Sequence, residues 1–176
     1  NSSATLRYLS TLALALMASA ATTHASPAEL SHFVTPSYRG LANTEWAIWD
    51  NFTLANGAPG NLPDFAGSTG NGTITQNTTG AFLTSGGNIY SFSVPTAFTV
   101  ADSTPFTLGT VTFQADTLGT LLDYNSVLLR YDNGGGLQTL ATTRTELYNS
   151  ALGGFGGSEV TSLWQWDVSA LGINSF

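Results

Sequence analysis

The sequence predicts an all-β fold: an antiparallel, two-sheet sandwich of jelly-roll-like order, preceded by a helical signal peptide. Three observations support this prediction. Gly and Pro interrupt the chain along its length, and no stretch from Ser26 to Phe176 keeps a 3.6-residue apolar period for three turns. Short segments of period two recur between turn clusters, and about eight strands at such spacing are typical of a sandwich or barrel.

Residues 1–25 are predicted to form a signal peptide. Arg7 precedes an apolar run from Leu9 to Met17, and small residues follow. Cleavage sites of the small-x-small type end at Ala20 and Ala25, and we prefer the second, which starts the mature chain at Ser26. A buried helix of the fold is the alternative. A membrane anchor is disfavoured because the run is shorter than the roughly 20 residues that a span needs.

Residues 26–176 are expected to form one β-sandwich domain, since this length suits a single core. The chain starts with Asn1, so we expect the positively charged start of the leader to be incomplete. A new alternating segment begins at Leu171, and the sequence stops shortly afterwards at Phe176. This pattern is compatible with a sandwich that lacks its last strand.

Alternation identifies the individual strands. The clearest covers 107–117, where Val111, Phe113 and Ala115 share one face. After Gly86 and Gly87 the chain alternates again, with Tyr90, Phe92 and Val94 on one face. The predicted strands are 44–53, 73–76, 81–84, 88–94, 97–100, 107–117, 126–131, 137–142 continuing through 143–147, and 162–168.

Turn residues separate these strands. Asp132 to Gly136 is a strong hairpin signal between two of them. A long loop rich in Gly, Pro and Asn is expected over 56–72, and a glycine-rich loop over 148–158.

Composition excludes several classes of function. The chain has no lysine, four arginines and eleven acidic residues, for a net charge of −7. Nucleic acids and anionic membrane surfaces both require clustered cations, so neither is an expected partner. There is no cysteine, which excludes disulfides, thiolate metal sites and cysteine nucleophiles.

No catalytic motif emerges, and no catalytic residue is assigned. His32 is the only histidine of the mature chain, and no Gly-x-Ser-x-Gly or His-Glu-x-x-His pattern accompanies it. A glycosidase needs two facing carboxylates, and no strand pattern puts two on one concave face. Glu146 follows Arg144 by two residues, which indicates a structural ion pair on one strand face.

Two groups of residues are candidates for binding. Asp123, Asn125, Asp132 and Asn133 are candidate ligands for a structural calcium ion, because calcium prefers oxygen ligands from loops. No other cofactor is expected.

Tryptophans supply the second group. Trp164 and Trp166 share a face and are predicted to fill the core, since large aromatics bury extensive apolar area. Trp46 and Trp49 lie three apart, so in a regular strand they face opposite ways. One of them is therefore the better candidate for an exposed ring that stacks on sugar.

Several segments together resemble the exported passenger domains of bacterial PEP-CTERM sorting-signal proteins. The Val-Pro-Glu-Pro tail that defines those proteins does not occur in the sequence. The resemblance implies a Gram-negative bacterium, a destination at the surface or in the matrix, and an association with exopolysaccharide production. It implies no catalytic residues. The segments are Tyr38–Gly40, Glu45–Asp50 with Phe52, Asn88–Phe92, Arg144–Leu147 and Leu163–Asp167.

The resulting hypothesis is a secreted or surface-associated, non-enzymatic matrix or structural protein. Its expected partners are extracellular polysaccharide or matrix proteins. The alternative is a carbohydrate-binding module, and a glycoside-active enzyme is the third candidate.

Overall fold

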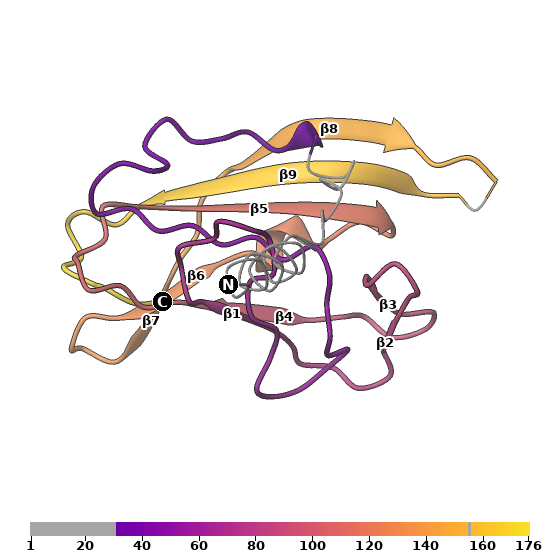
Figure 1. The fold of residues 1–176 in the computed structure, drawn as a ribbon, viewed down its shortest axis with the longest axis horizontal. Coiled ribbons are helices and arrows are strands. Elements are labelled where there is room, and N and C mark those ends of the chain that lie inside the picture. The colour runs from indigo at the N-terminus through magenta and orange to yellow at the C-terminus, as the bar shows by residue number, and fades with distance from the viewer. Residues whose placement is uncertain (1–30, 155) are drawn as a thin grey trace, which may run out of the picture. The chain divides into compact units, whose positions relative to one another are not determined.

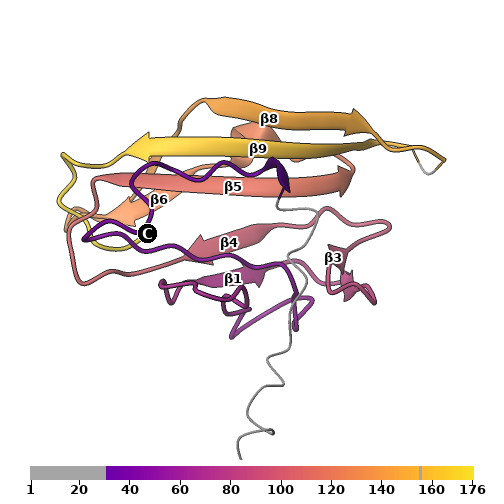
Figure 2. The same cartoon turned by 45° about the horizontal axis from the view of Figure 1, so that its top comes forward.

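The computed structural model describes residues 31–154 and 156–176, of which 32–176 form one compact unit. The predicted signal peptide lies outside the described residues. Regular structure in the described chain consists of antiparallel strands and short 3-10 segments, at residues 31–32 and in η2, Tyr124–Ser126 (Figures 1 and 2). The all-β prediction is confirmed at this level. The strands are β1 Thr73–Gln76, β2 Phe82–Leu83, β3 Ile89–Tyr90, β4 Phe98–Ala101, β5 Thr110–Gly119, β6 Leu129–Asp132, β7 Leu137–Leu140, β8 Arg144–Ala151 and β9 Ser158–Asp167.

The longest strands form one three-stranded sheet in the order β5–β9–β8. β5 and β9 pair without interruption from Thr110 opposite Asp167 to Gly119 opposite Ser158. Val111 lies opposite Trp166 and Phe113 lies opposite Trp164, so the apolar alternation of both strands points to the same face. The predicted common face of Val111, Phe113 and Ala115 is confirmed, since all three belong to the core or pack against it.

The alternation of side chains between the two faces of the sheet shifts by one residue part-way along β8. A bulge between Glu146 and Tyr148 inserts one residue against β9. Arg144 pairs with Trp164 on the core face, whereas Tyr148 pairs with Thr161 on the opposite, outer face. The bulge therefore places an aromatic ring on the outer face of the sheet.

The core lies on the inner face of this sheet. Trp164 is completely buried, and Trp166 is 4% exposed, which confirms their predicted core position. The indole Nε1 of Trp166 donates to the Leu140 carbonyl at 2.9 Å, joining the end of β7 to β9. The buried cluster comprises Leu108, Val111, Leu129, Tyr131, Trp164, Trp166, Val168 and Ile173.

The remaining strands pair in twos: β1 with β4, β2 with β3, and β6 with β7. The hairpin predicted across 132–136 is confirmed as the β6–β7 turn. The strand predicted over 73–76 is confirmed as β1, whereas most of the other predicted boundaries differ. Only Ile89–Tyr90 forms a strand within 88–94, and β8 and β9 extend into the loop predicted at 148–158.

The strand predicted over 44–53 is wrong, since these residues form no strand. Polar groups of a neighbouring loop satisfy this backbone in place of a partner strand. The Trp46 carbonyl accepts from the amides of Thr69 and Gly70 at 2.9 Å each, and the Asp50 amide donates to Asp64 Oδ1 at 2.9 Å.

Asn61 organises the same region. It is 4% exposed, and its Oδ1 accepts from the amides of Thr53 and Leu54 at 2.8 Å each. Its backbone pairs with Ile74 of β1 in both directions. Asn61 thus ties the segment before the loop through its side chain and β1 through its backbone.

No helix of the described residues is long and apolar enough to cross a membrane.

Candidate functional site

The outer face of the β5–β9–β8 sheet is polar. Period two puts Leu163, Gln165 and Asp167 of β9 on this face, because Trp164 and Trp166 point into the core. On β5, Thr110 and Thr112 lie opposite Asp167 and Gln165. Hydroxyl, amide and carboxylate groups therefore stand side by side across neighbouring strands.

Residues His32–Tyr38, here called the strap, cover one part of this face. The Gln114 side chain clamps the strap backbone: Val34 N donates to Oε1 at 2.9 Å and Nε2 donates to Val34 O at 2.8 Å. The Tyr38 hydroxyl is hydrogen-bonded to the Thr112 hydroxyl. The strap is thus attached to the sheet by specific polar contacts.

The start of the strap is attached through an aromatic contact. The His32 ring stacks on Tyr148 with ring centroids 3.5 Å apart and planes 6° apart. His32 Nε2 lies 3.9 Å from Glu159 Oε1. Tyr148 reaches this position because of the bulge in β8.

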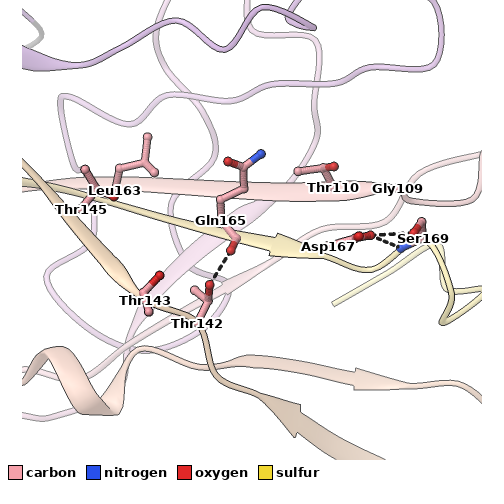
Figure 3. A pocket seen from close by; sticks show the side chains of 9 residues that line it. All are labelled: Gly109, Thr110, Thr142, Thr143, Thr145, Leu163, Gln165, Asp167 and Ser169. Atoms are coloured by element: carbon pink, nitrogen blue, oxygen red, sulfur yellow. Dashed lines mark hydrogen bonds between the residues drawn. The ribbon is translucent and has the colours of Figure 1, made fainter.

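Beyond the strap, the outer face opens into a groove of about 660 Å³ (Figure 3). Gln165 and Leu163 line both this groove and a smaller depression of about 180 Å³ beside the strap. The groove volume is in the range of small-ligand sites, about 300–1,000 Å³. Its lining residues are Gly109, Thr110, Thr142, Thr143, Thr145, Leu163, Gln165, Asp167 and Ser169.

The groove presents hydrogen-bonding groups of different kinds. The Thr142 hydroxyl donates to the Gln165 carbonyl at 2.6 Å, while the Gln165 amide group points away from its strand (Figure 3). Asp167 Oδ1 accepts from the Ser169 hydroxyl at 2.6 Å and from the Ser169 amide at 3.0 Å. These hydrogen bonds lower the pKa of Asp167, so it remains a carboxylate acceptor at neutral pH. Such a groove suits a ligand rich in hydroxyl groups.

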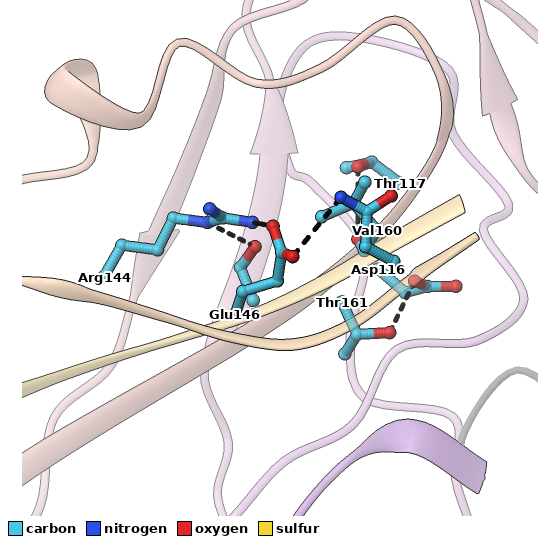
Figure 4. A network of polar contacts seen from close by, with 8 residues as sticks. Asp116, Thr117, Arg144, Glu146, Val160 and Thr161 are labelled. Atoms are coloured by element: carbon cyan, nitrogen blue, oxygen red, sulfur yellow. Dashed lines mark hydrogen bonds and ion pairs between the residues drawn. The ribbon is translucent and has the colours of Figure 1, made fainter. Parts of the chain in front are cut away.

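A second polar network lies on β8 and β9 (Figure 4). Arg144 Nη2 contacts Glu146 Oε2 at 2.8 Å, which confirms the predicted ion pair. The Arg144 Nε donates to the Ser162 hydroxyl at 2.8 Å, and the guanidinium lies 3.8 Å from the ring centroid of Tyr124. Hydrogen bonds lower the pKa of Glu146; the bond from Arg144 has the larger effect and the bond from Asn149 the smaller one. This network stabilises the packing of the sheet.

The predicted sugar-stacking residues lie in the loop region. Trp46 and Trp49 are both half-buried, so neither is the freely exposed ring that a strand would have presented. The Arg39 guanidinium covers the Trp46 ring at 3.5 Å from its centroid. Trp49 Nε1 donates to the Asn61 carbonyl at 3.0 Å, which fixes its indole within the loop.

The predicted calcium ligands occupy two turns, where three of them make hydrogen bonds to nearby residues of the chain. Asp123 Oδ1 accepts from the amide of Asn125, capping η2 at 3.1 Å. Asp132 Oδ1 accepts from the amides of Gly134 and Gly136 at 2.8 and 3.1 Å. Asn133 Oδ1 accepts from Gln138 Nε2 at 3.1 Å. The calcium site stays a prediction; residues 31–154 and 156–176 contain no group of three or more His, Cys, Asp or Glu able to hold a metal ion.

Sequence reasoning missed an aromatic cluster on the β2–β3 pair. Phe82 and Tyr90 are register partners, with ring centroids 5.5 Å apart. Phe92 lies 5.3 Å from Phe82 and 4.9 Å from Tyr90. The alternation of Tyr90 and Phe92 was visible in the sequence, but the pairing that adds Phe82 to them depends on the hairpin register.

Searches against family models, curated proteins and solved structures find no significant match for this chain.

Proposed function

We propose that the chain is an exported, surface-associated or secreted β-protein that associates with extracellular polysaccharide as a matrix component, without acting chemically on it. The observation that carries this proposal is the groove on the outer face of the β5–β9–β8 sheet. Of the nine residues that line it, Asp167 is the only charged one, and most of the others carry hydroxyl or amide groups.

The chemistry of this lining supports a polysaccharide ligand. Sugar hydroxyls both donate and accept hydrogen bonds, and the hydroxyl and amide side chains of Thr143 and Gln165 do the same. The ionised Asp167 carboxylate adds a strong acceptor. An open groove across neighbouring strands also allows an extended polymer to enter from the side.

Two further parts of the proposal come from the sequence. We propose that the paired strands form a two-layered, jelly-roll-like sandwich. We further propose that the export signal and the likeness to PEP-CTERM passenger domains correspond to a bacterial surface or matrix destination. A dedicated carbohydrate-binding module is the alternative role for the same groove. A glycoside-active enzyme would require a second, protonated carboxyl facing Asp167 in the groove.

The test is a pull-down of the chain from Ser26 onwards on insoluble polysaccharides, with and without EDTA. The panel consists of microcrystalline cellulose, curdlan and calcium alginate gel. We expect retention on at least one polymer, and Gln165→Ala should lower the association constant about three- to tenfold, since it removes about one hydrogen-bonding group. Thr139→Ala on β7 is the matched control, because Thr139 is an exposed strand residue that does not line the groove.

The outcomes separate the alternatives. Retention that is lost in EDTA on cellulose or curdlan would add the predicted calcium ion to the binding site. Release of reducing sugars from a retained polymer would favour the enzyme. Absence of retention on every polymer would contradict the proposed association.

A further inference from the structure

The β2–β3 pair presents the most exposed group of aromatic rings in the described chain. Phe92 is 82% exposed, Tyr90 43% and Phe82 39%. Burying such rings is strongly favourable, so a contiguous exposed cluster marks a binding surface more often than an isolated exposed residue does. We call Phe82, Tyr90 and Phe92 the aromatic platform.

The rings of the platform hold one another in place. Phe82 and Phe92 are stacked at an interplanar angle of 28°, and Tyr90 meets Phe92 edge-on at 76°. These are the favoured geometries for aromatic pairs. A ligand that stacks on them therefore meets rings whose rotamers are already restricted, which lowers the entropic cost of binding.

The backbone beneath the platform is equally constrained. The Thr84 and Gly87 amides donate to Asn88 O at 2.9 Å and Thr84 O at 3.0 Å, closing the turn between β2 and β3. The Gly87 carbonyl accepts from the Phe52 amide at 2.8 Å, which attaches the turn to the loop region. The Ser91 hydroxyl donates to the Val94 carbonyl at 2.7 Å, which holds the backbone on both sides of Phe92.

The chain segment that contains the platform lacks charged side chains, which indicates the kind of ligand that it binds. No Asp, Glu, Lys, Arg or His occurs between Phe65 and Ala101, so this whole segment is uncharged. Acidic and basic peptides, nucleic acids and anionic lipids would find no counter-charge on it. Short hydroxyl and amide side chains flank the rings instead, at Ser85, Asn88 and Ser93.

We infer that the aromatic platform is a second binding site, which takes the apolar face of sugar rings in a neutral polysaccharide. The C–H groups on that face carry partial positive charge and are attracted to the negative face of an aromatic ring. The Tyr90 hydroxyl has no hydrogen-bond partner among the described residues, so it is free to bond a sugar hydroxyl at the edge of the stack. The inference rests on the proposed function for the class of ligand, but it places a contact outside the groove.

The two sites lie apart on the chain. The groove is built from β5, β8, β9 and the residues next to them, whereas the platform consists of one residue each from β2 and β3 and of Phe92, two residues after β3 (Figures 1 and 2). No residue is common to both. The contribution of each can therefore be measured with separate variants.

The experiment measures binding isotherms on microcrystalline cellulose, a neutral glucan, with cellohexaose as the soluble competitor. Phe92→Ala should lower the association constant about tenfold, and Phe82→Ala/Phe92→Ala should lower it further, because each variant removes a stacking ring. Phe92→Trp should restore binding, since it keeps an aromatic face. Leu137→Ala is the matched control: Leu137 is another exposed apolar residue, at 72%, but lies on β7. Far-ultraviolet circular dichroism and thermal unfolding verify that each variant is folded.

Each outcome decides the inference. Loss of binding in Phe92→Ala with retention in Leu137→Ala and Phe92→Trp supports it, whatever Gln165→Ala does in the groove. Equal binding of wild type and Phe92→Ala overturns the platform but leaves the polysaccharide association standing. Failure of the wild type to bind cellulose overturns the platform. Light scattering that shows a dimer of the wild type, converted by Phe92→Ala to a monomer, overturns it in favour of a contact between copies of the chain.

Discussion

The β5–β9–β8 sheet and the loop region over 44–72 solve the same physical problem in different ways. Both must satisfy backbone amides and carbonyls that leave water. In the sheet, β9 does so with two neighbouring strands and an alternating sequence that points its tryptophans inward. In the loop region, backbone groups bond to Asn61, Asp64, Ser68 and Thr69 instead.

The difference shows where stability is expected to reside. The sheet supplies the extensive apolar burial, with Trp164 completely enclosed. The loop region depends on a few polar contacts, each of which is worth about 1 kcal/mol when intact but more when one partner is removed from a buried site. We therefore expect the sheet to govern global unfolding and the loop region to open locally.

The largest expected effect comes from the core of the sheet. Trp164→Ala should lower the free energy of unfolding by about 3–5 kcal/mol, because it leaves a cavity where an indole was fully buried. Chemical denaturation monitored by circular dichroism measures the loss. Leu137→Ala, at a 72% exposed position, should stay within about 0.5 kcal/mol of wild type. Similar losses in the two variants would contradict the assignment of the core.

A smaller and more local effect is expected from Asn61→Ala. The substitution removes the buried oxygen that accepts from the amides of Thr53 and Leu54, at a cost of about 2–3 kcal/mol. Hydrogen exchange should accelerate at these two amides while the amides of β9 keep their protection. Asn133→Ala, in an exposed turn, is the control. Equal loss of protection in β9 would show that the two regions unfold as one unit.

The smallest effects concern two carboxyl groups whose pKa values shift in opposite directions. Hydrogen bonds lower the pKa of Glu146, so its contribution to stability is present at neutral pH and is lost as the pH falls through that lowered pKa. Burial raises the pKa of Asp102, so its ionisation costs stability as the pH rises through the raised value. Glu146→Gln should therefore weaken the protein at neutral pH, and Asp102→Asn should strengthen it slightly.

Thermal unfolding between about pH 7 and about pH 3 checks both signs, since the difference from wild type should shrink in acid for each variant. A difference that grows in acid for either variant would reverse the assigned sign. The pair also compares the two regions, because Glu146 lies in the sheet whereas Asp102 follows β4 next to the glycines of the loop region.

Sequence reasoning was accurate where a strand alternates over many residues. It located β5, β9 and the β6–β7 hairpin, and it assigned Trp164 and Trp166 to the core. It failed over 44–53, which was predicted to be a strand and forms none. Nothing in that segment shows that Asn61, Asp64 and Thr69 will occupy its backbone groups, because these contacts join distant parts of a loop.

The candidate sites follow the same division. The threonine-rich strand faces were visible in the alternation, but the groove also needs Thr142, Thr143 and Ser169 from beyond the strand ends. The position of the strap depends on the Gln114 clamp, and the face of Tyr148 depends on the bulge in β8. These are long-range or single-residue effects that leave no periodic signal.

The sequence by itself determined the secondary-structure class, the apolar face of the long strands and the unusual scarcity of charge, because these properties follow from local alternation and composition. Tertiary structure alone decided that Trp46 and Trp49 are half-buried and that Phe82, Tyr90 and Phe92 are exposed together. Whether an aromatic ring is covered depends on which distant segments pack against it, and that pairing is set by the fold as a whole.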